Sequence, residues 1–184
     1  MMLTILGIAG SLRRGSHNRA LLRAAQSLAP EGTRLEIADI DGIPLFNQDL
    51  ERQPPAAVVD LKARIRAADA ILFATPEYNH SIPGVLKNAI DWASRPYGDS
   101  AWAGKPAAVM GASSGASGTM RAQAHLRQIF VTLDMPAVNQ PQVAIANAAA
   151  TFDADGNLTD QAAQQLIVRL LQNLATLTRK LKAP

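Results

Sequence analysis

The 184-residue sequence contains no cysteine, and this absence excludes disulfide bonds, thiol catalysis and thiolate metal sites. No run of about 18 apolar residues occurs, so no membrane-spanning helix and no membrane partner are expected. The first nine residues are apolar but lack a basic leader and a cleavage site, so no signal peptide is expected. Together these absences predict a cytoplasmic protein.

Net charge and aromatic residues are also scarce. Lys and Arg number 18 against 15 Asp and Glu, and the basic residues are scattered. Nucleic-acid binding would favour a clustered basic stripe, so no nucleic-acid partner is predicted. A mild positive field still suits anionic small molecules. At this length the simplest organisation is one domain, residues 1–184, with a mostly aliphatic core.

Apolar runs of strand length alternate along the chain with segments of helical periodicity. The strands are expected at residues 3–9, 34–39, 70–74, 106–111 and 138–145. The helices are expected at residues 18–29, 56–67, 84–94, 119–133 and 158–181. Five such units predict an α/β fold, a flavodoxin-like doubly wound five-stranded parallel sheet in the order 2-1-3-4-5 with helices on both faces.

In that strand order, ligands bind beyond the carboxyl ends of the strands, where the order reverses. The loops after the first, third and fourth strands, residues 10–18, 76–83 and 112–118, must therefore converge on one site. These are also the most unusual loops in the sequence. The connector 41–55 is too long to serve only as a link, so we expect it to cover a functional edge or a partner surface.

The first of these loops suits a phosphate monoester. It combines glycines, hydroxyls and two arginines just before a helix, where backbone N–H groups gather around an anion. It matches neither the P-loop nor the G-x-G-x-x-G dinucleotide fingerprint. Ser11, Ser16 and Asn18 can donate or accept hydrogen bonds, although Ser16 and Asn18 could also serve only as helix caps. The position after the first strand favours binding.

The second loop, residues 76–83, is stiffened by two prolines, which would preorganise the backbone groups of Glu77, Tyr78 and Asn79 to read the edge of a flat heterocycle. Tyr78 adds a flat apolar face. The alternative is a proline-bounded turn in which Tyr78 covers the edge of the core. The third loop, residues 111–118, has no large side chain and permits close approach of a ligand, or else is a flexible linker.

Four segments in order resemble the NAD(P)H-dependent FMN reductase family, which includes bacterial quinone, chromate and azo-dye reductases. They are GSLR with Ser16 and Asn18, TPEYN at 75–79, LKNAIDW at 86–92 and AGKP at 103–106. Four motifs in the expected order are far more specific than any one of them. The resemblance implies FMN bound without a covalent link, and NADPH or NADH as electron donor.

The resemblance also implies a role for each site residue. The FMN 5′-phosphate would be held by Ser11, Arg13, Ser16 and Asn18. The isoalloxazine ring would lie along Pro76, Glu77, Tyr78 and Asn79. The other edge of the ring would be completed by Ser113 and Gly115. The guanidinium of Arg13 suits this role because it can bind a phosphate through two parallel hydrogen bonds.

The family resemblance further implies a homodimer or homotetramer with the flavin near the interface. Trp92, Tyr97 and Trp102 are candidates for that interface, because aromatic residues are favoured there. Ordinary core packing is the alternative for these residues.

No residues form a nucleophile–base pair or a metal-binding pattern, so no catalytic residue and no metal site are predicted. This fits a flavoenzyme, in which the cofactor carries the redox chemistry. His80 near the ring could handle protons, but a position facing solvent is favoured.

The predicted activity is FMN-dependent NAD(P)H:acceptor oxidoreduction with ping-pong hydride transfer. Its acceptor would be a small molecule: a quinone, an azo compound, free flavin or a metal oxyanion. The first alternative is a flavodoxin-type electron carrier without substrate turnover. The slightly basic chain, with Ser and Arg in its phosphate loop, favours the enzyme over that usually acidic class. A second alternative is a phospho-ligand-binding module without redox function.

Overall fold

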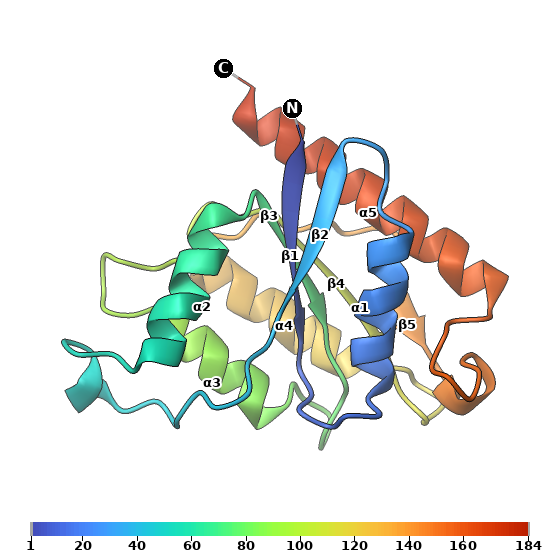
Figure 1. Ribbon diagram of the computed structural model, residues 1–184, viewed down its shortest axis with the longest axis horizontal. Coiled ribbons are helices and arrows are strands. Elements are labelled where there is room, and N and C mark those ends of the chain that lie inside the picture. The colour runs from blue at the N-terminus through green and yellow to red at the C-terminus, as the bar shows by residue number, and fades with distance from the viewer. Residues whose placement is uncertain (1, 184) are drawn as a thin grey trace.

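The computed structural model describes residues 2–183 and places a five-stranded sheet between two layers of helices (Figure 1). All neighbouring strands are parallel, and their order is β2-β1-β3-β4-β5. The strands are β1 (Leu3–Ala9), β2 (Thr33–Ala38), β3 (Ala70–Ala74), β4 (Ala107–Ala112) and β5 (Val143–Ile145). This topology confirms the predicted flavodoxin-like fold.

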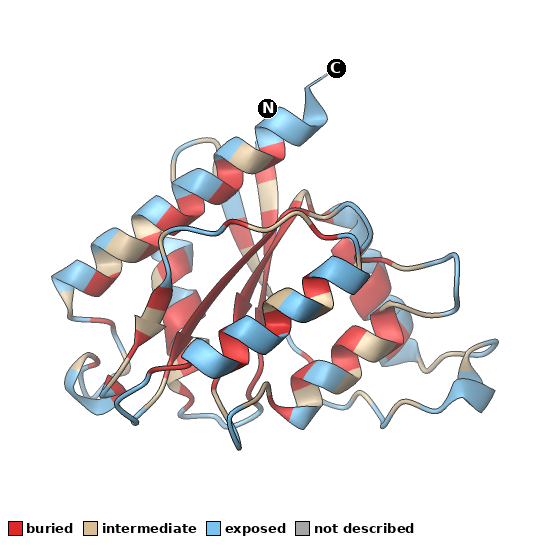
Figure 2. Ribbon diagram, turned by 180° about the vertical axis from the view of Figure 1, so that it is seen from behind, coloured by how far each residue is buried: buried red, intermediate tan, exposed pale blue. Residues whose placement is uncertain are grey.

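Five helices cover the two faces of the sheet. They are α1 (His17–Ser27), α2 (Ala56–Ala67), α3 (Gly84–Ala93), α4 (Met120–Thr132) and α5 (Gln161–Lys182), with short 3₁₀ turns η1 (Gln48–Leu50) and η2 (Ala148–Ala150). Helices α1 and α5 pack on one face, through Leu22 and Leu170 against Leu72. Helices α2, α3 and α4 pack on the other face, where Phe130 meets Phe73. Figure 2 shows the result for α4: its buried residues face the sheet and its exposed residues face outward.

The register of the strands brings the functional loops to one edge. Ala9 pairs with Ala74, and Ala74 pairs with Met110, so β1, β3 and β4 end almost level with one another. All three strands are buried nearly throughout, as expected for parallel strands covered on both faces. Their following loops therefore leave the sheet side by side, at the lower edge in Figure 1.

Two elements begin three or more residues later than the sequence predicts. The strand expected at 138–145 covers only Val143–Ile145, because the chain forms an isolated bridge with β4 at Ala137 and then passes through Pro141, which has no N–H for a ladder. The helix expected from residue 158 begins at Gln161, because the side chain of Asp160 caps it by accepting the Ala163 N–H. The bounds of β1, β3 and α2 are as predicted.

The structure supports the core-packing alternative for Trp92 and Trp102 and contradicts their role in a subunit interface. Each is 1% exposed within the chain itself. The indole N–H of Trp92 donates to the carbonyl of Pro44 at 2.8 Å, and that of Trp102 donates to Ile90 at 3.0 Å. Buried indoles with satisfied donors are core residues. Tyr97, by contrast, is 88% exposed.

The long connector 41–55 packs along α3. The Phe46 N–H donates to the Asn88 side chain at 2.7 Å, and the Asn88 amide donates back to Pro44 at 2.9 Å. Leu45 on the same segment is 83% exposed. The connector is thus anchored by polar contacts and still presents an apolar residue to solvent.

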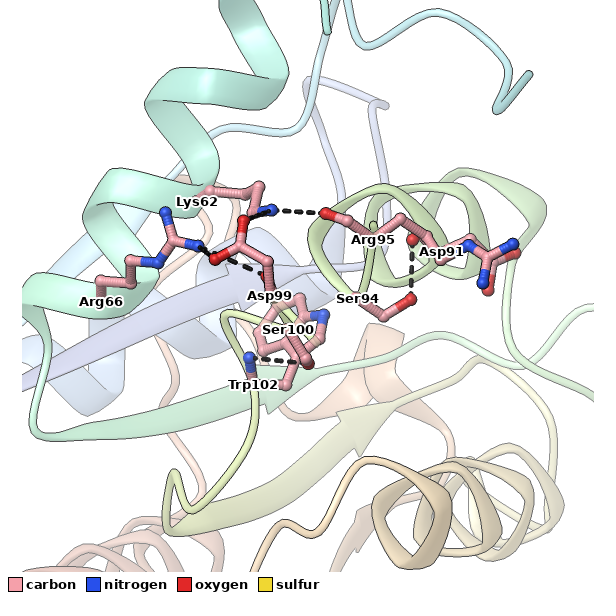
Figure 3. A network of polar contacts seen from close by, with 8 residues as sticks. All are labelled: Lys62, Arg66, Asp91, Ser94, Arg95, Asp99, Ser100 and Trp102. Carbon is pink, nitrogen blue, oxygen red and sulfur yellow. Dashed lines mark hydrogen bonds and ion pairs between the residues drawn. The ribbon is translucent and has the colours of Figure 1, made fainter. Parts of the chain in front are cut away.

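A polar network anchors the loop after α3 to α2 (Figure 3). Asp99 accepts hydrogen bonds from Lys62 at 2.8 Å and Arg66 at 2.6 Å, and these two bonds lower the pKa of Asp99. Lys62 is buried and also donates to the carbonyl of Arg95. These bonds account for the burial of a charged lysine, because the amine has both an anion and a carbonyl as partners.

No helix within residues 2–183 combines the length and apolar character needed to cross a bilayer.

Candidate functional site

A cavity of about 230 Å³ lies where the loops after β1, β3 and β4 meet. Eight of the ten predicted site residues line it: Ser11, Arg13, Ser16, Asn18, Pro76, Glu77, Tyr78 and Ser113. Asn79 and Gly115 do not line it. The predicted convergence of three loops therefore occurs, and it places hydroxyls and a guanidinium around one hollow.

Asn18 joins two of these loops. Its side-chain amide donates to the Ala112 carbonyl at 2.8 Å, and its amide oxygen accepts the Ala112 N–H at 2.9 Å. The residue is 2% exposed and links the start of α1 to the end of β4. From the sequence, Asn18 is predicted as a ligand or a helix cap, and nothing local to it marks this link. One amide hydrogen of Asn18 remains to donate to a bound anion.

Ser16 acts as the N-cap of α1. Its hydroxyl oxygen accepts the N–H groups of Asn18 at 3.2 Å and Arg19 at 3.4 Å. The hydroxyl hydrogen is still available to donate, so capping and ligand binding are compatible. The first turn of α1 contains no acidic side chain, which leaves the partial positive charge of the helix N-terminus to attract an anion.

The donor set around the cavity fits a phosphate. Ser11 and Ser16 supply hydroxyls, and Arg13 supplies a guanidinium that has no ion-pair partner among residues 2–183. Gly10 keeps the backbone close to its neighbours: a Cβ there would lie 3.1 Å from Leu86 Cδ2 and 3.2 Å from Pro76 Cδ. These donors are the ones that anion recognition requires.

Residues 76–81 form a tight turn beside the cavity, which we call the platform turn. Tyr78 and Ser81 exchange two backbone hydrogen bonds of 3.0 Å, and Asn79 (φ 50°) and His80 (φ 62°) adopt the left-handed conformation. This geometry is typical of a two-residue turn with positive φ at both centres. The expectation that the Tyr78 N–H reads a ring is wrong, because the turn uses it. The N–H groups of Glu77 and Asn79 have no hydrogen-bond partner among the described residues.

The Tyr78 side chain is 51% exposed, which contradicts the alternative in which it covers the edge of the core. His80 is exposed at the tip of the same turn, as favoured from the sequence. The platform turn therefore offers an aromatic face and two backbone donors to solvent, directly beside the cavity.

The carboxylate of Glu77 anchors the platform turn to α4. It accepts the N–H groups of Arg121 at 3.0 Å and Ala122 at 3.1 Å, and the Arg121 guanidinium lies 2.5–2.6 Å away. Burial alone would raise the pKa of Glu77, but the hydrogen bonds from Ala122 and Arg121 outweigh it, and the pKa is lowered. Glu77 thus caps α4, a role that could be found only once the two segments, 44 residues apart, were seen together.

The third loop is small for reasons of packing. A Cβ at Gly111 would lie 2.0 Å from Thr119 Oγ1 and 2.4 Å from the Thr75 carbonyl. Ser113 donates its N–H to Ile145 at 2.9 Å and accepts the Ala148 N–H at 3.0 Å. The loop is therefore held on both sides, which contradicts the flexible-linker alternative. Gly115 is less restricted, since a Cβ there would meet only Ser113 Oγ, at 3.5 Å.

A parallel α/β sheet with an anion cavity at its switch point, flanked by an exposed aromatic turn, is the arrangement of a nucleotide- or flavin-binding protein. Residues 3–150 match the family model described as NADPH-dependent FMN reductase. The chain belongs to this family. It is an oxidoreductase with FMN as its bound cofactor and NAD(P)H as its electron donor.

Two curated relatives and one solved structure cover nearly the whole chain. An NAD(P)H-dependent FMN reductase of Pseudomonas aeruginosa is 54% identical over 97% of this chain and 96% of its own length. A 2-hydroxy-1,4-benzoquinone reductase of a Burkholderia species is 44% identical over 97% and 98%. The flavoenzyme NAD(P)H:(acceptor) oxidoreductase FerB from Paracoccus denitrificans superposes with a TM-score of 0.89 at 38% identity, over 97% and 98%.

Proposed function

We propose that this protein reduces quinones with electrons from NAD(P)H in a ping-pong order, in which the oxidised donor leaves before the acceptor binds at the same place. The observation that carries the proposal is the exposed platform turn directly beside the phosphate-sized cavity. The names of the relatives support a quinone as acceptor. FMN supplies the capacity to accept a hydride from one partner and pass it to the next.

The size of the cavity supports an open site. About 230 Å³ is below the usual range of roughly 300–1,000 Å³ for small-molecule pockets. In this proposal the cavity encloses the phosphate end of the cofactor, and the ring lies along the platform turn with one face open to solvent. Donor and acceptor would then share that face, which a ping-pong order requires.

The residues of the site divide into two groups by what they offer. In the proposal, the phosphate is held by Ser11, Arg13, Ser16 and the free amide hydrogen of Asn18. The N–H groups of Glu77 and Asn79 face the polar edge of the ring, Pro76 and Tyr78 lie against its surface, and Ser113 and Gly115 border its other edge. No residue is assigned as an acid or base, because the cofactor carries the redox step.

Steady-state kinetics test the reaction order. NADPH oxidation is measured at several fixed concentrations of a benzoquinone, and parallel double-reciprocal lines are expected. Intersecting lines would contradict the ping-pong order. Negligible NADPH oxidation by the flavin-loaded protein would favour the electron-carrier alternative, and turnover with azo dyes or chromate but not with quinones would overturn the acceptor assignment.

Cofactor retention tests the phosphate assignment separately. The double substitution Arg13→Ala with Ser16→Ala is expected to weaken FMN retention while the domain stays folded. Arg14→Ala is the matched control, since Arg14 is exposed on the same loop but does not line the cavity. Unchanged retention in the double variant would count against the assignment.

We also propose that the protein is a homo-oligomer, a dimer or a tetramer, in the cytoplasm. A groove of about 620 Å³ between α3 and α4 supports this, because Ile82, Ile90, Ile129 and Leu133 line it and Ser81 connects it to the platform turn. Sedimentation of the wild type and Ile129→Asp tests the proposal, with loss of the oligomer expected in the variant. A monomeric wild-type protein would contradict the proposed oligomer. Cell fractionation tests the cytoplasmic location.

A further inference from the structure

His17 lines the phosphate cavity although its side chain was not among the predicted ligands. It is the first residue of α1 and shares the cavity wall with Ser11, Arg13 and Ser16. Its two ring nitrogens have no hydrogen-bond partner among residues 2–183. An imidazole with free nitrogens at an anion site can donate one hydrogen bond when neutral and two when protonated.

The imidazole ring of His17 lies against the ring of Phe152. Their ring centroids lie 5.2 Å apart with an interplanar angle of 31°. Phe152 is buried and pairs with Leu158 in a short antiparallel bridge. This segment follows residue 150, where the match to the family model ends. Phe152, which lies outside that match, therefore packs against His17 in the wall of the cavity.

Several charged groups lie near His17, on its own loop and on the neighbouring segments. On its own loop, Arg13 is a neighbouring cation, and the N-terminus of α1 adds partial positive charge. From the loop after β3, Glu77 contributes a carboxylate to the cavity lining, and Arg121 neutralises it. Beside Phe152, the carboxylate of Asp153 accepts hydrogen bonds from Asn157 and Asp155. The groups nearest the His17 ring on the cavity wall are therefore cationic or already paired.

We infer that His17 is a further ligand of the FMN 5′-phosphate, held by Phe152, and that its protonation couples FMN affinity to pH. This inference rests on the phosphate placement in the proposed function. A bound phosphate dianion stabilises the imidazolium, so by linkage a protonated His17 binds FMN more tightly. Histidine is the side chain type that ordinarily changes charge near neutral pH, so the coupling is tested on both sides of pH 7.

Flavin affinity of the full-length protein tests the inference. Equilibrium dialysis followed by flavin fluorescence gives the Kd at pH 6.5 and 8.5 for FMN and for riboflavin, which lacks the phosphate. For the wild type, the FMN Kd is expected to fall about 5-fold from pH 8.5 to 6.5, a coupling of the usual size. The riboflavin Kd is expected to stay unchanged.

Two variants isolate the imidazole. His17→Phe keeps an aromatic ring against Phe152 and removes the ionisable imidazole, so its FMN Kd should lose the pH dependence. If this variant fails to fold, His17→Gln removes the imidazole in its place. Phe152→Leu, which releases the imidazole, is expected to weaken the pH dependence.

The inference is overturned if His17→Phe keeps the wild-type pH dependence, or if riboflavin shows it too. Failure of the proposed function gives a different result. It would appear as absent or sequential quinone turnover, or as unchanged FMN retention in the Arg13 and Ser16 double variant. If only the His17 inference fails, the ping-pong turnover and the weaker retention of the double variant are still observed.

Discussion

The two sides of the site are built in opposite ways. On the packed side, the loops after β1 and β4 are joined by the buried side chain of Asn18, and Gly111 at the end of β4 leaves no room for a Cβ. On the open side, the platform turn is fastened at its base to α4, by Glu77 to Arg121 and by Ser81 to His125, and its tip is exposed. The difference shows how one site can hold a cofactor's charged end firmly and leave its reactive end accessible.

The packed side should be the more sensitive to added volume. Gly111→Ala is expected to destabilise the fold by about 3 kcal/mol, because the new methyl group would overlap Thr119 and the Thr75 carbonyl. Urea unfolding checks this, with Gly115→Ala as the control that should stay within about 0.5 kcal/mol of the wild type. Equal losses in both variants would remove the distinction between the two positions.

Loss of the link between the loops should have the next largest effect. Asn18→Ala leaves the buried N–H and C=O of Ala112 without partners, at an expected cost of about 2 kcal/mol in unfolding free energy, together with weaker FMN binding. Asn79→Gly on the open side is the control, because glycine readily adopts the positive φ at that position. A larger loss for the control would reverse the comparison.

The anchor of the platform turn should respond to pH. The pKa of Glu77 is lowered in the folded protein, so its ionised form stabilises the fold above the unfolded-state pKa of about 4.3. That contribution is lost as the pH falls through the folded-state pKa. Glu77→Gln is therefore expected to lower the melting temperature at pH 7, with the difference from the wild type shrinking as the pH falls below the unfolded-state pKa. A difference that persists at low pH would show that the hydrogen-bond geometry, and not the charge, matters.

The smallest effect on stability is expected at the exposed tip. Tyr78→Ala should change the unfolding free energy by less than about 0.5 kcal/mol, because the side chain is half exposed. It should nevertheless alter the flavin absorbance spectrum or the quinone KM. A stability loss without any spectral or kinetic change would make Tyr78 a packing residue.

The sequence predicted the helices and strands closely where their periodicity was strong. β1, β3 and α2 have the predicted bounds, and the other elements apart from β5 and α5 begin and end within about two residues of the prediction. The meeting of the three loops was also predictable, because parallel strands in a known order end at one edge.

Several features of the site were not predictable from the sequence. The bonds from Asn18 to Ala112 and from Glu77 to Arg121 span 94 and 44 residues, and no local pattern marks them. The contact between the tilted rings of His17 and Phe152 joins residues even farther apart in sequence. The burial of Trp92 depended on the carbonyl of Pro44 lying within reach of its indole N–H.

The sequence by itself determined the alternation of strands and helices, the strand order that follows from it, and the family to which the motifs point. It did so because periodicity, turn residues and motif spacing are local properties of the chain. Only the tertiary structure decided which polar groups satisfy one another and which remain free for a ligand. A side chain's partner depends on distances between segments far apart in sequence, and a hydrogen bond or an ion pair forms only when those segments come within about 3 Å of each other.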